Sequence, residues 1–150
     1  MDDKALIREA AAARNMSYSP YSGFMVGAAL LGKSGKVYRG CNIENAGYSP
    51  SNCAERTAFF KAVSEGEREF AAIAVVGGPR DSQALGYAHP CGVCRQVMME
   101  FCSPESFRVI VGTSGEDFAV YTLAELLPHG FGPQQLQQRD QRDAGPSSRD

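Results

Sequence analysis

The chain contains no long hydrophobic run, although 43% of its 150 residues are hydrophobic. Its longest apolar stretches are FMVGAALL at 24–31 and FAAIAVV at 70–76, far below the roughly 20 residues of a membrane-spanning helix. The first residues, MDDK, are acidic where a secretory signal peptide is basic. We therefore expect a soluble, cytoplasmic protein with no membrane partner.

A surplus of positive charge is also missing. Fifteen Lys and Arg side chains are balanced by seventeen Asp and Glu side chains, which gives a net charge of -2. Binding to nucleic acid usually needs a basic surface, so this balance argues against a nucleic-acid partner and favours a small, weakly charged substrate. The sequence also lacks the Walker and dinucleotide-binding glycine motifs.

The five cysteines are an odd number, which a fully paired disulfide framework cannot use. The length suits one compact domain with an ordinary core rather than a tiny secreted scaffold. We expect reduced thiols, some of them metal ligands.

The order of the periodic segments predicts an α/β fold. Helices are expected at 2–15, 53–65, 90–101 and 122–127, and strands at 24–31, 36–43, 70–78, 107–112 and 118–123. This order predicts a three-layer α/β/α sandwich around a five-stranded mixed sheet. The catalytic domain is expected to span 1–133. The segment 134–150, rich in Gln, Asp, Arg, Ser and Pro, is expected to be a disordered polar tail.

Two short motifs carry the chemistry. If Pro90 is the first helical residue, Cys91 and Cys94 lie on one face within the opening turns of that helix. A CxxC spacing alone is typical of redox pairs as well as metal sites. Cys53 stands at a second predicted helix start, so two helix N-termini could converge with three thiols between them. The positive ends of the helices would then favour the thiolate forms. Three protein ligands leave one position of a tetrahedral zinc open, as in catalytic sites.

Glu55 has two interpretations. It could complete a capping box with Asn52 as N-cap, although Ser or Thr is the usual cap in that motif. It could instead be the general base that hydrolysis at a metal centre needs. The presence of Cys53 two residues earlier and of PCGVC at 90–94 favours the catalytic interpretation.

C-A-E followed by P-C-x-x-C is the three-cysteine form of the zinc deaminase signature. More specifically, GCNIENAGYSPSNCAERTA at 40–58 and PCGVCRQ at 90–96 closely resemble the small cytidine deaminases, which are homotetramers. The resemblance runs from SPYSGFMVGAAL at 19–30 to ELLPHGFGP at 125–133. It implies zinc-dependent hydrolytic deamination of cytidine and deoxycytidine, with release of ammonia, in pyrimidine salvage.

The resemblance also implies roles for single residues. Zinc is expected on Cys53, Cys91 and Cys94, with Glu55 moving protons between water, ring N3 and the departing amine. Arg56 is expected to hydrogen-bond the sulfurs and offset their negative charge. The expected substrate-binding residues are Asn42 and Glu44 for the sugar 3′-hydroxyl, Phe24 against the pyrimidine, Ala54 through its backbone, and Phe131 reaching into a neighbouring subunit's site. This last role implies a homotetramer with sites at subunit interfaces.

His89 departs from the family, which commonly has Ser or Thr before the proline. It is either a partly exposed loop imidazole or a group beside the metal that competes as a ligand or titrates near neutral pH. Cys41 and Cys102 have no role in the family and are expected to be small buried hydrophobes. His129 is expected in a turn without a chemical role.

Three alternative functions remain open. The same site could deaminate another cytosine-bearing small molecule, such as an aminoacylnucleoside antibiotic. The protein could be a noncatalytic zinc-stabilised binding module, which would not require Glu55. The CGVC motif could serve a thioredoxin-like redox role.

Overall fold

The computed structural model describes residues 1–82 and 85–136. In chain order its elements are α1 (Asp3–Arg14), β1 (Phe24–Gly32), β2 (Val37–Cys41), α2 (Ala54–Ser64), β3 (Phe70–Pro79), α3 (Gly92–Phe101), β4 (Arg108–Gly112), β5 (Phe118–Thr122) and α4 (Leu123–Leu126). The predicted order of helices and strands is confirmed. Of the predicted tail, residues 134–136 belong to a helical turn over 133–136, and the remainder lies outside the described residues.

The sheet is mixed, as predicted. Its strand order is β2-β1-β3-β4-β5. Strands β1 and β2 form the predicted hairpin around GKSG, and β1 also pairs antiparallel with β3. The β3–β4 pair is parallel and is connected through α3, whereas β4 and β5 are antiparallel. The sheet therefore has two crossover connections: α2 joins β2 to β3 across β1, and α3 joins the neighbouring parallel strands β3 and β4.

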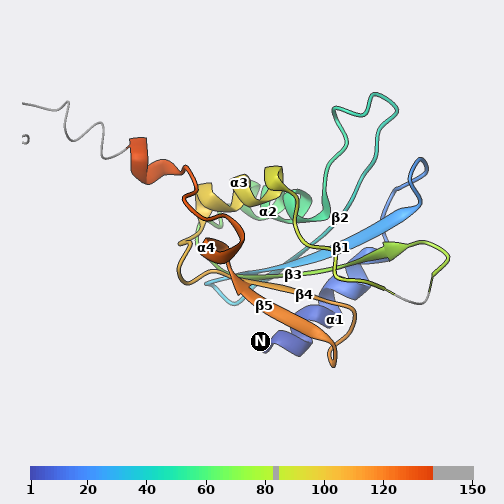
Figure 1. The fold of residues 1–150 in the computed structure, drawn as a ribbon, viewed down its shortest axis with the longest axis horizontal. Coiled ribbons are helices and arrows are strands. Elements are labelled where there is room, and N and C mark those ends of the chain that lie inside the picture. Colours follow the sequence, from blue (N-terminus) through green and yellow to red (C-terminus); the bar gives the residue numbers. More distant parts are fainter. Residues whose placement is uncertain (83–84, 137–150) are drawn as a thin grey trace, which may run out of the picture.

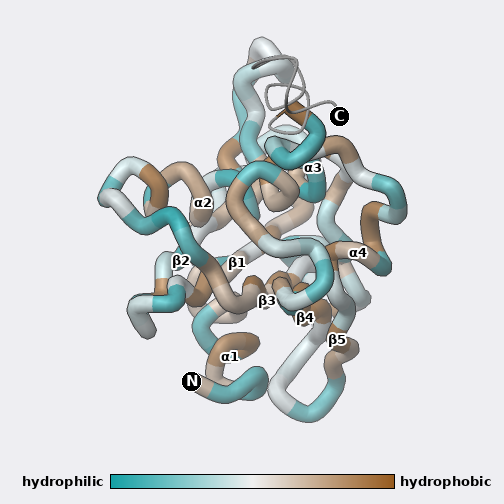
Figure 2. Tube along the Cα trace, turned by 90° about the vertical axis from the view of Figure 1, so that its left-hand side faces the viewer, coloured by the Kyte–Doolittle hydropathy of each residue, from teal (hydrophilic) through white to brown (hydrophobic). Residues whose placement is uncertain are grey.

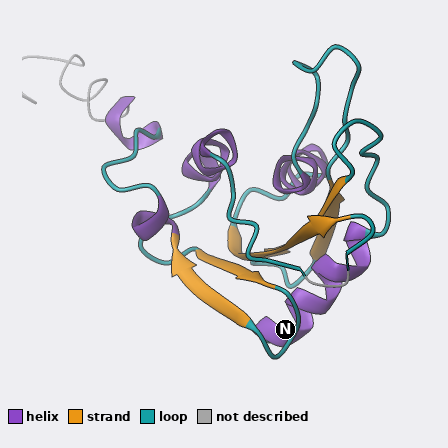
Figure 3. Cartoon of the chain, turned by 45° about the vertical axis from the view of Figure 1, so that its right-hand side comes forward, coloured by secondary structure: helices purple, strands orange, loops and turns teal. Residues whose placement is uncertain are grey.

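Helices cover both faces of the sheet (Figures 1 and 3), with α1 on one face and α2, α3 and α4 on the other. Because successive side chains of a strand point to opposite faces of the sheet, each face of the sheet has its own hydrophobic core. In β1, Ala28 and Leu30 pack toward α2, whereas Ala29 and Leu31 pack toward α1. Figure 2 shows hydrophobic colour mostly where the strands lie between the helices and hydrophilic colour mostly on the connecting loops. The predicted three-layer sandwich is confirmed.

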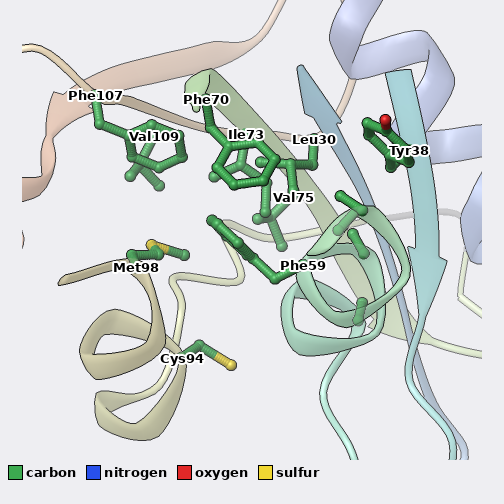
Figure 4. Close-up of a cluster of buried hydrophobic side chains, with 14 of the residues drawn as sticks. Leu30, Tyr38, Phe59, Phe70, Ile73, Val75, Cys94, Met98, Phe107 and Val109 are labelled. Atoms are coloured by element: carbon green, nitrogen blue, oxygen red, sulfur yellow. The ribbon is translucent and has the colours of Figure 1, made fainter. Parts of the chain in front are cut away.

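The core on the α2 and α3 side is aromatic. The Phe59 ring of α2 lies 5.1 Å from the Phe70 ring of β3, measured between centroids. Met98 of α3 and Phe107 complete this cluster and are also fully buried. Cys94 belongs to the same cluster, and its sulfur points from α3 toward α2 (Figure 4). Packing of the core therefore also fixes the position of a sulfur.

Both helix starts differ slightly from the prediction. The α3 helix begins at Gly92 rather than at Pro90, because Cys91 has extended backbone angles (φ -69°, ψ 170°) and is the N-cap. In the same way Cys53, rather than Asn52, is the N-cap of α2. The Asn52 backbone instead pairs with Ile43, through two N–H···O bonds of 2.9 Å. The capping-box interpretation of Asn52 and Glu55 is therefore wrong.

No helix within residues 1–82 and 85–136 combines the length and the apolar character needed to cross a lipid bilayer.

We predict that Gly27→Ala destabilises the fold, because β1 runs directly beneath α1 at this position. A Cβ at residue 27 would lie 2.7 Å from the Arg14 Cα and would also collide with the Ala10 carbonyl oxygen. Overpacking of this kind costs about 1–3 kcal/mol, so the Tm should fall by roughly 3–9 °C. Gly86→Ala is the control, because among the described residues no atom beyond its two chain neighbours lies within 4 Å of a Cβ there. Equal Tm values for the two variants would contradict this account of the packing.

Candidate active site

Three cysteine sulfurs meet where α2 and α3 begin. The Sγ of Cys53 lies 3.7 Å from that of Cys91, which lies 3.5 Å from that of Cys94. Among the His, Cys, Asp and Glu residues that the structure describes, these are the ones whose ligand atoms gather within 4.8 Å of one another. Two of the sulfurs stand on N-cap residues, so they lie at the positive ends of two helices.

The spacing of the sulfurs fits a zinc ion. With Zn–S bonds of about 2.3 Å, a tetrahedral site places its sulfurs about 3.8 Å apart, close to the 3.5 and 3.7 Å found here. A disulfide would need about 2.05 Å, and all five cysteines are free. Cys53, Cys91 and Cys94 would therefore hold the metal.

Arg56 supplies positive charge to the sulfur cluster. Its Nη2 donates to the Cys53 Sγ at 3.3 Å. Hydrogen bonds from Cys94, Arg56 and Cys91 lower the pKa of Cys53 to about 5, whereas the contact with Cys53 and burial raise the pKa of Cys94. The cluster thus favours a thiolate on Cys53, which helps a divalent cation displace the thiol protons. The predicted contact between Arg56 and a cysteine sulfur is confirmed.

Glu55 is a buried carboxyl beside the sulfurs. It lies in the first turn of α2, two residues after Cys53, and only 5% of its surface is exposed. Burial raises the pKa of Glu55 to about 7, and the nearby Cys53 adds to this shift. A buried carboxyl at a pocket wall is a common arrangement for a group that exchanges protons with a substrate.

A pocket of about 320 Å³ opens onto this cluster. Most of the residues predicted to act on substrate line it, together with two of the sulfur-bearing residues: Phe24, Asn42, Glu44, Cys53, Ala54, Glu55, Arg56 and Cys91. Phe24 is an apolar side chain at the strand end of the pocket and is 42% exposed. Ala54 lies in the first turn of α2, where backbone N–H groups have no partner within the helix.

Asn42 and Glu44 follow β2 and are held by the neighbouring chain. The Asn42 side chain accepts from the Val26 N–H at 2.9 Å and donates to the Phe24 carbonyl oxygen at 2.8 Å, as a paired strand would. The Glu44 carboxylate accepts hydrogen bonds from Tyr21 and Ser22, and the bonds from Ser22 are the main cause of its lowered pKa. Glu44 is therefore an ionised, oriented acceptor in the pocket wall.

His89 also lines the pocket, but it lies outside the sulfur cluster. Its Nε2 lies 3.2 Å from the Tyr121 hydroxyl, and the two rings meet edge to face at 5.5 Å. The His89 side chain is thus exposed on a loop beside the pocket and contacts Tyr121 rather than the sulfurs.

Three other residues stand apart from the pocket. Phe131 is 57% exposed and does not line the pocket of its own chain, so its predicted role stays a prediction. Cys102 packs against the aromatic core, as a small hydrophobe would, but like Cys41 it is only partly buried. Cys41 is only partly buried, and its thiol donates to the Met16 carbonyl oxygen at 3.4 Å, so its prediction as a buried hydrophobe is wrong. Cys41 is the last residue of β2, an edge strand with a neighbouring strand on one side only.

Sequence comparison identifies the family. A family model described as the cytidine and deoxycytidylate deaminase zinc-binding region matches residues 1–112. The chain belongs to the cytidine and deoxycytidylate deaminase family. The cytidine deaminase of Sporosarcina psychrophila is 51% identical over 136 residues, which cover 91% of this chain and 96% of that protein. The cytidine deaminase of Halalkalibacterium halodurans is 53% identical over 131 residues, covering 87% and 95% respectively.

Solved structures of the family agree. The crystal structure of cytidine deaminase from Burkholderia pseudomallei is 50% identical with a TM-score of 0.79, and the match covers 87% of this chain and all of that one. The enzyme from Mycobacterium tuberculosis is 35% identical with a TM-score of 0.73 and covers 88% and 98%. These similarities extend over the sheet and both helix starts that carry the sulfurs.

Sequence reasoning did not identify every residue of the pocket. Val26, Ser51, Asn52 and Ala88 also line it. Val26 can be predicted from the sequence, because residues two apart on a strand share a face and Phe24 is expected to contact the substrate. For Ser51 and Asn52, the only indication in the sequence of a place in the pocket is that they directly precede Cys53. Ala88 lies on a loop whose path no local pattern indicates.

We predict that Arg56→Gln weakens the metal site. Groups that hydrogen-bond metal ligands typically contribute about 10–100-fold in metal affinity or activity, so zinc should pass to a chelator at least about tenfold faster. Arg68→Gln is the matched control, because Arg68 is an exposed arginine that bonds only the Val63 carbonyl among the described residues. Release of zinc at the wild-type rate, with an unchanged turnover, would show that Arg56 does not act on the sulfurs.

Proposed function

We propose that the chain catalyses the zinc-dependent hydrolytic deamination of cytidine to uridine, with release of ammonia. One observation carries this proposal: three sulfurs lie at zinc-ligand spacing, and two of their residues line the same pocket as a buried carboxyl. The curated cytidine deaminases that are about half identical over nearly their full length support the same assignment.

The chemistry follows from the positions of the groups. Zinc, when bound, supplies the Lewis acidity that makes water a nucleophile near neutral pH. Glu55 takes a proton from the attacking water and delivers protons to ring N3 and to the leaving amine. The two protons of the water thus end on N3 and on ammonia, the C4–N bond breaks, and the water oxygen remains as the C4 carbonyl. Because Glu55 is buried, its proton exchanges with the substrate rather than with bulk solvent.

The rest of the pocket holds the nucleoside. Phe24 packs against the pyrimidine ring, and the Ala54 backbone N–H meets the polar edge of the base. Asn42 and Glu44 take the sugar 3′-hydroxyl as donor and acceptor. Each of these residues lines the pocket that contains Glu55.

Two alternatives from the sequence are less well supported. A redox role for CGVC leaves the Cys53 sulfur, 3.7 Å from Cys91, without a purpose. A purely structural zinc site explains neither the pocket of about 320 Å³ nor the burial of Glu55 beside the sulfurs. A third alternative, deamination of another cytosine-bearing small molecule, would use the same chemistry. Measuring turnover with a panel of such substrates would distinguish it from deamination of cytidine.

We propose further that residues 1–133 form the catalytic domain of a homotetramer whose sites lie at subunit interfaces, with Phe131 entering a neighbour's site. The exposure of Phe131 supports this arrangement. Deoxycytidine is proposed as a second substrate, and pyrimidine salvage as the metabolic role. A cytoplasmic location is proposed because the free cysteines suit a reducing compartment.

We predict that Glu55→Gln lowers the turnover of cytidine by at least about 10²-fold, the low end of general acid–base contributions. The variant should retain its zinc, because Glu55 is not a member of the sulfur cluster. Turnover is followed by the ultraviolet change as cytosine becomes uracil, and zinc by metal analysis. Glu65→Gln, at the other end of α2 in an exposed ion pair with Lys36, is the control and should keep the wild-type rate. If Glu55→Gln keeps full activity, the proposed mechanism is wrong.

We predict that active-site complementation reveals a shared site. Phe131→Ala and Glu55→Gln chains should each be impaired alone, whereas refolded mixed oligomers should exceed the activity of either parent. The reason is that some sites then combine an intact Glu55 with an intact Phe131 from a neighbour. Light scattering gives the number of chains. A mixture no more active than its parents would show that Phe131 does not complete a neighbour's site.

A further inference from the structure

The Glu44 carboxylate lies in a cradle of hydrogen-bond donors from the loop before β1. Its Oε1 accepts from the backbone N–H groups of Tyr21 and Ser22, at 2.9 and 3.1 Å. Its Oε2 accepts from the Ser22 hydroxyl at 2.5 Å. Successive backbone N–H groups in a tight turn form a concavity that binds anions. Here the anion is the protein's own side chain, 22 residues further along the chain.

The loop that forms this cradle is fixed at both ends. The Arg80 backbone N–H donates to the Gly23 carbonyl at 2.7 Å, and its guanidinium donates to the Ser19 carbonyl at 2.8 Å. Ser19 is 1% exposed, so this end of the loop is part of the protein interior. Gly23 has a φ of +69°, in the left-handed region that favours glycine, and it closes the turn with a bond to Ser19. The cradle is therefore set before any ligand arrives.

The Ser22 hydroxyl joins two walls of the pocket. Its oxygen accepts from the Phe24 N–H at 3.0 Å. A hydroxyl has a single hydrogen, and that hydrogen is directed to Glu44. Phe24 and Glu44 both line the pocket, whereas Ser22 does not. Ser22 thus connects Phe24, the residue proposed to contact the base, to Glu44, the residue proposed to contact the sugar. Ser22 itself would not touch a nucleoside in that pocket.

We propose that Ser22 is a positioning residue that sets substrate specificity by orienting the Glu44 carboxylate toward the sugar 3′-hydroxyl. The inference rests on the proposed function of the pocket. Donors from residues 21 and 22 occupy one side of the carboxylate, which leaves its remaining lone pairs for a hydroxyl on the pocket side. Without the Ser22 hydroxyl the carboxylate can rotate, and the enzyme loses preference for nucleosides that carry a 3′-hydroxyl.

The test compares cytidine with 3′-deoxycytidine in the wild type and in Ser22→Ala. Removing a hydrogen bond to a charged group should raise the KM for cytidine by about tenfold, with kcat nearly unchanged. The kinetic constants for 3′-deoxycytidine should not change, because that substrate has no group for Glu44 to accept. Ser22→Thr keeps the hydroxyl and should restore the preference for cytidine.

Ser34→Ala is a matched control within the same chain. The Ser34 hydroxyl also donates to a glutamate, Glu67, at 2.5 Å and also accepts from the backbone N–H two residues later. It lies in the turn between β1 and β2 and does not line the pocket. It should therefore leave both substrates at wild-type values.

A loss of equal size for the two substrates would show that Ser22 supports the pocket in general, and the inference would be overturned. A wild type that treats the two substrates alike would overturn it as well, while turnover of cytidine would leave the deaminase assignment intact. If the protein does not turn over cytidine at all, the proposed function fails. In that case, the affinities of the same variants for uridine and 3′-deoxyuridine are measured by calorimetry. Weaker binding of uridine alone in Ser22→Ala supports the role of Ser22, and an equal loss for both ligands overturns it.

Discussion

Convergence of two helix N-termini on one side of the sheet is the constraint on which the site depends. Cys53 and Cys91 are the N-caps of α2 and α3, so their sulfurs meet only if these helices are held side by side. The aromatic core does this, because Phe59 of α2 and Met98 of α3 belong to one buried cluster. Cys94 is itself a member, so a change in the core that shifts α3 also moves a metal ligand.

The same convergence explains the electrostatics of the site. Two positive helix ends and the Arg56 guanidinium offset the negative charge that three thiolates bring to a zinc ion. For Glu55, burial outweighs the opposing effects of its own backbone N–H, Arg56 and Cys94, and raises its pKa to about 7. The start of α2 thus carries two functional groups that are two residues apart: the Cys53 sulfur, which favours its thiolate form, and the Glu55 carboxyl, which can hold a proton.

The sequence predicted the architecture well because the segments are short and strongly patterned. Leu6, Ile7, Ala10 and Ala13 follow helical spacing and are buried in α1. The errors were local: Pro90 precedes α3 instead of opening it, and Asn52 pairs with Ile43 through its backbone instead of capping α2. The cradle of Ser22 around Glu44 could not be predicted, because it depends on how two loops meet across a distance of 22 residues in the chain.

The most direct test of the central claim is a zinc titration of the metal-free protein, with cytidine turnover measured at each addition. The account predicts that activity rises in proportion to bound zinc and stops rising at one zinc per chain, because Cys53, Cys91 and Cys94 form a single site. Cytidine turnover by fully metal-free protein, or no turnover with one zinc bound to each chain, would contradict it.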